Sequence, residues 1–190
     1  MRIITGRARG LQLNTPKNMD VRPTADRVKE SVFNIIGNKI VQAEVVDLFA
    51  GTGNLGLESW SRGAAAVTFI DASRESLRIV ESNVQKCRAQ EACTLLKGNA
   101  VQIISRLHQQ GKRFDFAFCD PPYNKGWLEQ IMQALEQSPL LQEGGYLVME
   151  RSPQEELASL PEDYTLVRSA KYGDTVVDFI RFATLQEPDA

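Results

Sequence analysis

An acid, two prolines and an aromatic residue follow one another at Asp120, Pro121, Pro122 and Tyr123. They come directly after the apolar run 114–119, which predicts a buried strand. The prolines restrict their own backbone torsions, and Pro121 also pushes the preceding Asp120 towards an extended conformation. The result is a stiff loop at the carboxyl end of a strand, where open α/β sheets bind ligands.

The parts of this loop suit a planar heterocycle that carries an exocyclic amine. The heterocycle can stack on Tyr123, while the amine donates one N–H to the Asp120 carboxylate and the other to the Pro121 carbonyl. Both hydrogen bonds localise the lone pair of the nitrogen, which becomes a better nucleophile, and Pro122 keeps the loop from collapsing. The competing interpretation is a proline-stiffened turn with Asp120 as a cap and Tyr123 in the core, because short motifs also occur by chance.

A glycine-rich loop follows a second apolar run, 45–50, and precedes a helical pattern. Gly51, Gly53 and Gly56 fit G-x-G-x-x-G, a pattern that permits a tight turn and a close approach of the backbone to a ligand. A further apolar run ends in Asp71, at the distance of about 20 residues where such folds place a ribose-binding carboxylate. Strand, loop, helix and acid together predict a site for a nucleoside cofactor.

The charges near this loop favour S-adenosylmethionine over a dinucleotide. NAD needs its pyrophosphate at the N-terminus of a helix, but the loop contains no Lys or Arg. S-adenosylmethionine carries a cationic sulfonium and suits acidic surroundings, which Asp47, Glu58, Asp71 and Asp120 are predicted to supply. An NAD-dependent oxidoreductase would also leave the loop at Asp120 without a role. S-adenosylmethionine is therefore the predicted cofactor.

These motifs resemble those of class I methyltransferases that modify amino groups. The resemblance rests on the segment from Asp47 to Glu58 together with residues 120–123. Three further segments, 1–10, 22–30 and 171–175, are more specific. With them, nearly the whole chain resembles the RsmD family of bacterial rRNA methyltransferases, which methylate N2 of one guanine in small-subunit (16S) rRNA.

The resemblance implies a Rossmann-like class I methyltransferase fold of the α/β class. We expect a mostly parallel seven-stranded sheet with an antiparallel last strand, helices on both faces, and an N-terminal β-hairpin and helix. The implied reaction is in-line methyl transfer to guanine N2, with Asp120, Pro121, Pro122 and Tyr123 as catalytic residues. The cofactor-binding residues are then expected to be Asp47, Phe49, Gly51, Gly53, Asn54, Asp71, Ala72, Asn99, Ala100 and Asp120. Asn99 equally suits the cap of a helix.

The net charge of −2 conceals a segregation of charge along the chain. Residues 1–29 carry seven basic and two acidic residues, a net +5, and the remainder carries a net −7. A basic arm on an acidic body suits an enzyme that meets RNA phosphates through counterion release and also holds a cationic cofactor. The predicted RNA contacts are Arg2, Arg7, Arg9, Arg22, Arg27 and Lys29. The alternative is that these charges merely solvate a surface, and Arg27 could pair with Asp26 or Glu30.

The chain reads as one domain, with a hairpin arm at 1–22, a catalytic core at 23–185 and a polar tail at 186–190. Helices are expected near 73–89, 100–110 and 127–137, and strands at 146–150, 164–169 and 175–183. The three cysteines lack a C-x-x-C spacing, so neither a zinc site nor a disulfide is expected. Without a signal-peptide core or an apolar stretch of membrane length, a soluble cytoplasmic monomer is expected.

Three alternatives to a guanine-N2 enzyme remain at this stage. An N6-adenine DNA methyltransferase would use the same loop, but it usually carries an extra target-recognition region for which 190 residues leave little room. The others are an NAD-dependent oxidoreductase and a non-catalytic RNA-binding assembly factor. The small number of arm cations suggests modest affinity for bare RNA, so the expected substrate is 16S rRNA within a protein-containing small ribosomal subunit.

Overall fold

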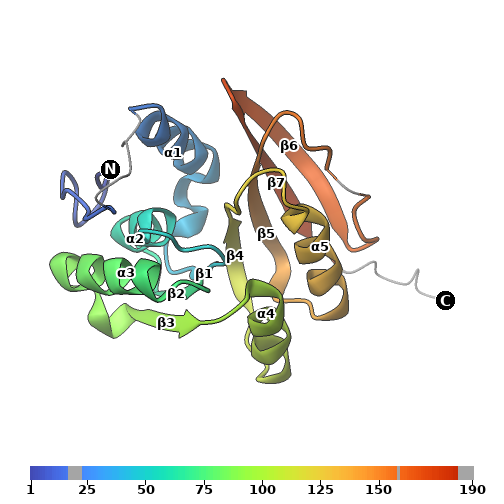
Figure 1. Cartoon of the computed structure of the whole chain (residues 1–190), viewed down its shortest axis with the longest axis horizontal. Helices are drawn as coiled ribbons and strands as arrows, with labels where there is room; N and C mark the ends of the chain where they lie inside the picture. Colours follow the sequence, from blue (N-terminus) through green and yellow to red (C-terminus); the bar gives the residue numbers. More distant parts are fainter. Residues whose placement is uncertain (17–22, 158, 184–190) are drawn as a thin grey trace.

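The computed structural model describes residues 1–16, 23–157 and 159–183. These residues form one seven-stranded sheet with helices packed against it (Figure 1). The strands are β1 (Glu44–Asp47), β2 (Ala66–Asp71), β3 (Cys93–Lys97), β4 (Phe114–Cys119), β5 (Leu141–Arg151), β6 (Tyr164–Tyr172) and β7 (Thr175–Phe182). The helices are α1 (Pro23–Ile36), α2 (Asn54–Ser61), α3 (Arg74–Cys87), α4 (Ala100–Gln109) and α5 (Trp127–Gln137), with short 3-10 turns η1 (Gly37–Ile40) and η2 (Gln90–Ala92). Arg22 and the predicted tail 186–190 lie outside the described residues.

The order of the strands creates a break in chain direction at the middle of the sheet. The order is β3-β2-β1-β4-β5-β7-β6. Strand β1 pairs in parallel with both β2 and β4, so the chain winds outwards from β1 and then returns to its other side. Such a switch point leaves a crevice at the carboxyl ends of the two central strands. Strand β7 runs antiparallel to both β5 and β6, which confirms the predicted antiparallel last strand.

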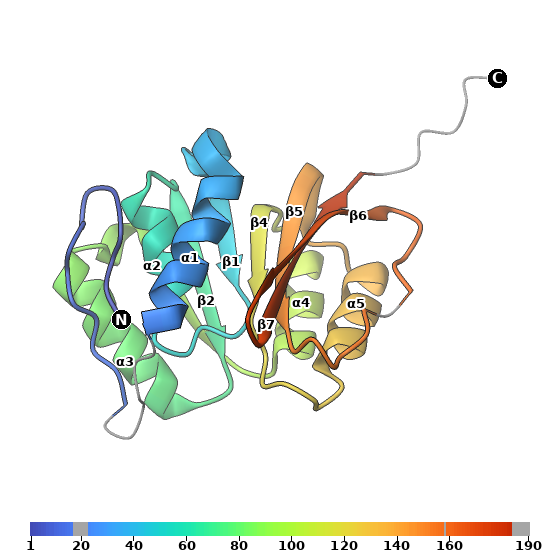
Figure 2. The ribbon, with the colours of Figure 1, turned by 90° about the horizontal axis from the view of Figure 1, so that it is seen from above.

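Helices cover both faces of the sheet (Figure 2), and an apolar layer lies between the sheet and the helices on each face. Side chains alternate along each strand, so Val45 joins one layer and Val46 the other. The first layer packs under α1, α2 and α3, and it also takes Ile3 and Leu13 from the N-terminal arm. The second layer packs under α4 and α5. The predicted arrangement, with helices on both faces, is confirmed.

The N-terminal arm is a hairpin held by few backbone hydrogen bonds. The amide of Ile3 donates to the Leu11 carbonyl at 3.0 Å, and the amide of Gly10 donates to the Ile3 carbonyl at 2.8 Å. Gly6 adopts a φ of 91° in the turn, and a Cβ added there would lie 1.8 Å from the Ser61 carbonyl oxygen of α2. The turn therefore packs so closely on α2 that a side chain at this position cannot fit.

Several element boundaries differ from those expected from the sequence. The predicted helix from residue 73 begins one residue later, because Ser73 accepts a hydrogen bond from the Ser76 amide and is the cap. Strand β5 begins at Leu141, five residues before the predicted 146–150, because it pairs through an irregularity with β4 despite the two glycines at 144 and 145. Boundaries of this kind depend on neighbouring strands that local patterns do not reveal.

Within the described residues, no helix is long and apolar enough to cross a membrane. The same part of the chain contains no group of three or more His, Cys, Asp or Glu side chains placed to hold a metal ion. Cys87, Cys93 and Cys119 are free thiols.

Candidate active site

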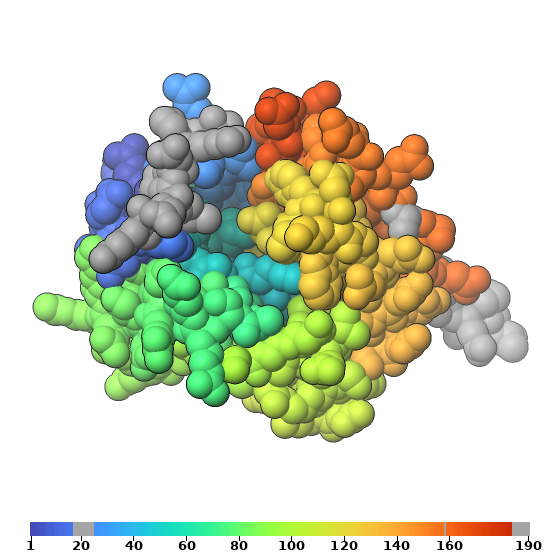
Figure 3. Space-filling model, in the orientation of Figure 1, coloured from blue at the N-terminus to red at the C-terminus, as the bar shows by residue number. Residues whose placement is uncertain are grey.

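A cavity of about 650 Å³ opens at the carboxyl ends of the central strands. Asp47, Asp120 and Glu150 line it from the ends of β1, β4 and β5, and Thr175 lines it from the start of β7. Helix α1 contributes its apolar side chains to another wall. In Figure 3 this side of the molecule is hollowed between the blue N-terminal segments and the yellow residues that follow β4. The cavity therefore lies at the switch point of the sheet, where such folds bind ligands.

Many of the residues predicted to bind ligands line this cavity. The lining residues are Asp47, Phe49, Gly51, Asn54, Asp120 and Tyr123. The other residues predicted for the site do not belong to the lining of the cavity: Gly53, Asp71, Ala72, Asn99, Ala100, Pro121 and Pro122. The structure therefore brings the acidic loop after β4 and the glycine loop after β1 to one concave surface.

The glycine loop adopts backbone conformations that favour glycine. Gly51 has a φ of 56° and open space where a side chain would be, and Gly53 has a φ of 80° as the cap residue of α2. The Asp71 carboxylate accepts hydrogen bonds from the amides of Gly51 at 2.9 Å and Ser73 at 2.8 Å. Asp71 therefore shapes the loop, and its oxygens keep further lone pairs for a ligand.

Asn99 and Ala100 stand at the start of α4, beyond β3. The Asn99 side chain accepts a hydrogen bond from the Val101 amide at 2.9 Å, so it caps the helix as the alternative interpretation proposed. Ala100 is buried in the apolar layer under α4. An adenine contact at these two residues stays a prediction.

The loop after β4 is held by a network that joins three strands. The Tyr123 hydroxyl donates to Oε1 of Glu150 at 2.5 Å and lies 3.2 Å from Oγ1 of Thr175. These contacts hold the half-buried tyrosine ring in one orientation in the cavity wall. The Phe49 ring contacts the Trp127 ring edge-on, with 5.3 Å between the two ring centroids. The loop is therefore a preorganised surface with one acid and one ring.

Three acids of the cavity, Asp120, Glu150 and Asp47, have raised pKa values. Asp120 is exposed where it lines the cavity, but neighbouring protein atoms displace part of the water around its carboxyl. This desolvation, together with the charges of Glu150 and Asp47, raises the pKa of Asp120 above its usual range. Burial likewise raises the pKa of Glu150. It also raises the pKa of Asp47 to about 7, although hydrogen bonds from the Gly56 and Phe49 amides act to lower it. A bound cation would return these groups to their ionised form.

Asp47 also carries an unpartnered oxygen. Its Oδ2 accepts from the Gly56 amide at 3.3 Å, while its buried Oδ1 has no hydrogen-bond partner. Buried polar atoms are rarely left in this state unless a ligand or water completes them. The cavity lining contains four carboxylates, Asp47, Asp120, Glu150 and Asp174, and its one Lys or Arg within the described residues is Lys29. This donor set fits a cationic cofactor better than a pyrophosphate.

We expect Asp47 to make the ligand-free protein less stable as the pH rises. A carboxyl whose pKa is near 7 when folded and 3.8 when unfolded binds its proton more tightly in the folded state, so stability present at pH 4 is lost by pH 7. The loss is on the order of 4 kcal/mol. Urea unfolding across this range should show a clearly shallower pH dependence for Asp47→Asn. Asp174→Asn, which removes an exposed carboxyl from the same cavity, is the control. Equal slopes for wild type and Asp47→Asn would contradict this account.

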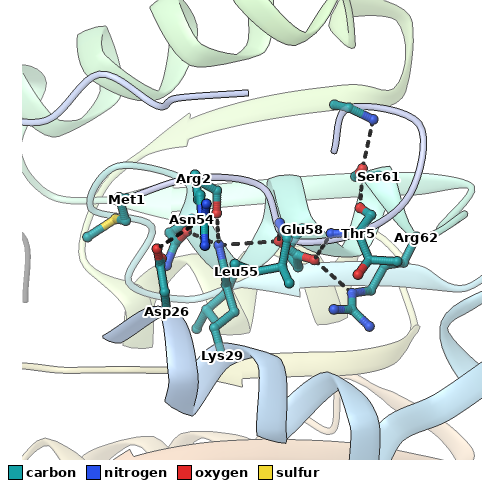
Figure 4. Close-up of polar contacts among 12 residues, drawn as sticks. Met1, Arg2, Thr5, Asp26, Lys29, Asn54, Leu55, Glu58, Ser61 and Arg62 are labelled. Carbon is teal, nitrogen blue, oxygen red and sulfur yellow. Dashed lines mark hydrogen bonds and ion pairs between the residues drawn. The ribbon is translucent and has the colours of Figure 1, made fainter. Parts of the chain in front are cut away.

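Two predicted charges have structural roles instead. The Lys29 side chain is 1% exposed and its ammonium lies 3.2 Å from Oε2 of Glu58, which is fully buried. Arg62 pairs with the same carboxylate at 2.8 Å (Figure 4). The prediction that Lys29 contacts RNA is therefore wrong, because its charge is enclosed by protein. Glu58 is likewise compensated by two cations, so the expectation that it serves a cationic cofactor is also wrong.

The other described cations that were predicted to contact RNA stay exposed. The Arg7 guanidinium stacks on the Trp60 ring at 5.0 Å, and the exposed Arg2 lies 3.7 Å from the Asp26 carboxylate. Arg9 and Arg27 are also exposed. An RNA contact at these four residues stays a prediction.

Comparison with known proteins shows the family to which this chain belongs. The family described as conserved hypothetical protein 95 matches residues 1–181. This chain belongs to that family. Ribosomal RNA small subunit methyltransferase D of Escherichia coli (strain K12) is 33% identical over 190 residues, which cover all of this chain and 94% of that protein. YlbH of Bacillus subtilis (strain 168) is 32% identical over 177 residues, 93% of this chain and 96% of YlbH.

A solved structure of a family relative has the same fold. The structure of yhhF from Escherichia coli matches with a TM-score of 0.85 and 31% identity, over 97% of this chain and 99% of that chain. The resemblance to the RsmD family and the predicted methyltransferase fold are thereby confirmed.

Sequence reasoning missed Glu150 and Thr175, which hold Tyr123. Glu150 ends an apolar run at the same sheet edge as Asp47 and Asp120, so the rule applied to those two acids would also have found it. Thr175 ends the segment 171–175 that contributed to the family resemblance, but that segment did not indicate a place in the cavity. Thr175 reaches the cavity because β7 inserts beside β5, and that pairing joins segments far apart in the sequence.

Proposed function

We propose that this protein is an S-adenosylmethionine-dependent methyltransferase that acts on the exocyclic N2 amine of a guanine in small-subunit rRNA. The observation that carries the proposal is the meeting of two loops in one cavity: the acidic loop 120–123 and the glycine loop after β1. The full-length relative from Escherichia coli is named for methylation of small-subunit rRNA, which supports the substrate class.

The cofactor assignment rests on the charge of the cavity. Carboxylates outnumber basic groups in its lining, and the ammonium of Lys29 is paired with Glu58. The unpartnered oxygen of Asp47 and the open space at Gly51 leave room for a polar ligand. Asp47, Phe49, Gly51 and Asn54 would hold the cofactor within the cavity, while Asp71 would bind its ribose. An NAD-dependent oxidoreductase is disfavoured because Lys29, the one Lys or Arg side chain that the described residues contribute to the lining, is paired with Glu58 and would not face a pyrophosphate.

The loop after β4 would bind and orient the acceptor base. The Tyr123 ring would stack on an extruded or unpaired guanine, while Asp120 and the Pro121 carbonyl accept the two N–H bonds of its N2 amine. Most of the rate acceleration would come from this orientation. S-adenosylmethionine, when bound, would supply the methyl group: the amine lone pair would form the N–C bond while the C–S bond breaks and its electrons stay on sulfur. Asp120 would stabilise the positive charge that develops on nitrogen, and the methylated nitrogen, which becomes acidic as the methyl group transfers, would release its proton to solvent.

The reaction can be tested with tritiated S-adenosylmethionine. Small subunits and total RNA from a strain that lacks this gene are incubated with the protein, and the labelled RNA is digested to nucleosides. We expect label in N2-methylguanosine of small-subunit rRNA. Asp120→Ala is the control for contaminating methyltransferases.

The other outcomes separate the competing functions. Label in N6-methyladenine would keep the chemistry of the loop and overturn the guanine assignment. Label in bare rRNA at the same rate as in subunits would overturn the expectation that a protein-containing particle is the substrate. Cofactor binding without any label would favour an RNA-binding assembly factor.

A further inference from the structure

The buried Lys29 connects three parts of the molecule. Its ammonium donates to the Arg2 carbonyl of the arm at 2.5 Å and to Oδ1 of Asn54 at 2.6 Å, besides its ion pair with Glu58 (Figure 4). Asn54 is the first residue of α2 and lines the cavity, as Lys29 itself does. One side chain of α1 therefore contacts both the arm and the first residue of α2, directly after the glycine loop.

This contact determines which way the Asn54 amide is turned. An ammonium group can only donate hydrogen bonds, so the Asn54 atom beside it must be the oxygen. The Nδ2 group, which can only donate, is left as the part of the amide that can serve a ligand. S-adenosylmethionine carries a carboxylate on its amino-acid end, and that anion needs donors. Lys29 thus presets Asn54 as a donor.

Lys29 and its partner Glu58 together anchor the arm. Glu58 accepts hydrogen bonds from the amides of Ile4 at 2.8 Å and Thr5 at 3.1 Å. A second link runs through Asn83, whose Nδ2 donates to the carbonyls of Asn14 in the arm and Thr52 in the glycine loop, at 3.0 and 2.8 Å. Lys29 and Asn83 therefore each contact both the arm and the segment of the glycine loop and Asn54.

Burying a lysine is costly, and a structural anchor does not require it. An ion pair removed from water contributes little net stability, because desolvation offsets the attraction, although such pairs can impose one specific geometry. Burial accordingly lowers the pKa of Lys29, in opposition to the charge of Glu58. A group retained at this cost is consistent with a role in positioning.

We propose that Lys29 is a positioning residue that orients Asn54 towards the carboxylate of the cofactor and thereby couples cofactor binding to the docking of the N-terminal arm. The inference rests on the proposed use of S-adenosylmethionine. Because coupling between two sites is reciprocal, a cofactor that is bound through Asn54 must strengthen arm docking by the same factor that docking strengthens cofactor binding.

The test measures S-adenosylhomocysteine, which carries the same carboxylate, in two ways. Calorimetry gives its affinity, and amide hydrogen exchange at Ile4 and Thr5 reports arm docking with and without the ligand. In the wild type, saturating ligand should slow exchange at these amides by about tenfold, a common size for such coupling. Lys29→Met should weaken ligand binding by about tenfold and abolish the response of the arm amides. Lys39→Met, which removes an exposed lysine after α1, should match the wild type in both.

Asn54→Asp separates positioning from a purely structural contact. The aspartate still accepts from Lys29, so the arm amides should remain protected without ligand, but it has no donor for a carboxylate. We expect weaker ligand binding and no arm response. If Asn54→Asp binds ligand as tightly as the wild type, Lys29 only holds the fold and the inference is wrong. If the wild type itself does not bind S-adenosylhomocysteine, the proposed function fails instead.

Discussion

Asp120→Ala should lower the rate of methyl transfer by about 10²–10³-fold while cofactor affinity changes only a few-fold. The carboxylate is the charged acceptor at the point where positive charge develops on the amine, and losing such a group typically costs this much in rate. Asp120 lines the cavity from the loop after β4, across from the glycine loop that is proposed to hold the cofactor. Single-turnover rates with saturating substrate would measure the loss.

The control for this prediction is Asp174→Ala. Asp174 is an exposed acid that lines the same cavity from the turn between β6 and β7. We expect its loss to reduce the rate far less, since it does not belong to the loop that holds the amine. If Asp120→Ala lost cofactor binding together with activity, Asp120 would be assigned to the cofactor and not to the acceptor base.

Glu58→Gln should destabilise the folded protein by about 3–5 kcal/mol, the usual result of breaking a buried ion pair. Glu58 is fully buried and pairs with both Lys29 and Arg62. A glutamine keeps the size and one acceptor oxygen, but it leaves the enclosed ammonium of Lys29 without a charge partner. Urea unfolding would measure the change. Glu81→Gln, an exposed substitution on α3, should stay within about 0.5 kcal/mol of the wild type.

A double-mutant cycle tests whether the stability lost in Glu58→Gln comes from the ion pair between Lys29 and Glu58. Lys29→Met removes the uncompensated charge, so the double variant with Glu58→Gln should lose clearly less stability than the two single losses combined. Simple addition of the single effects would show that the two side chains do not depend on each other.

The sequence by itself determined most of the local structure and indicated several of the residues that line the cavity. The loop at 120–123 was predictable because proline restricts torsions that depend on no distant contact. The loop after β1 was predictable for a similar reason, since Gly51 and Gly53 adopt positive φ values that glycine tolerates. The helix 127–137 coincides with α5 because an amphipathic repeat is a local signal.

The tertiary structure alone decided which charges face solvent and which partners hold the site. In the sequence Lys29 is one of several N-terminal cations. Only the packing of α1 on α2 and on the arm encloses it beside Glu58. The Tyr123 hydroxyl meets Glu150 and Thr175 because β4, β5 and β7 come together in the sheet. Burial and pairing between distant segments depend on the whole fold, so no local pattern in the sequence records them.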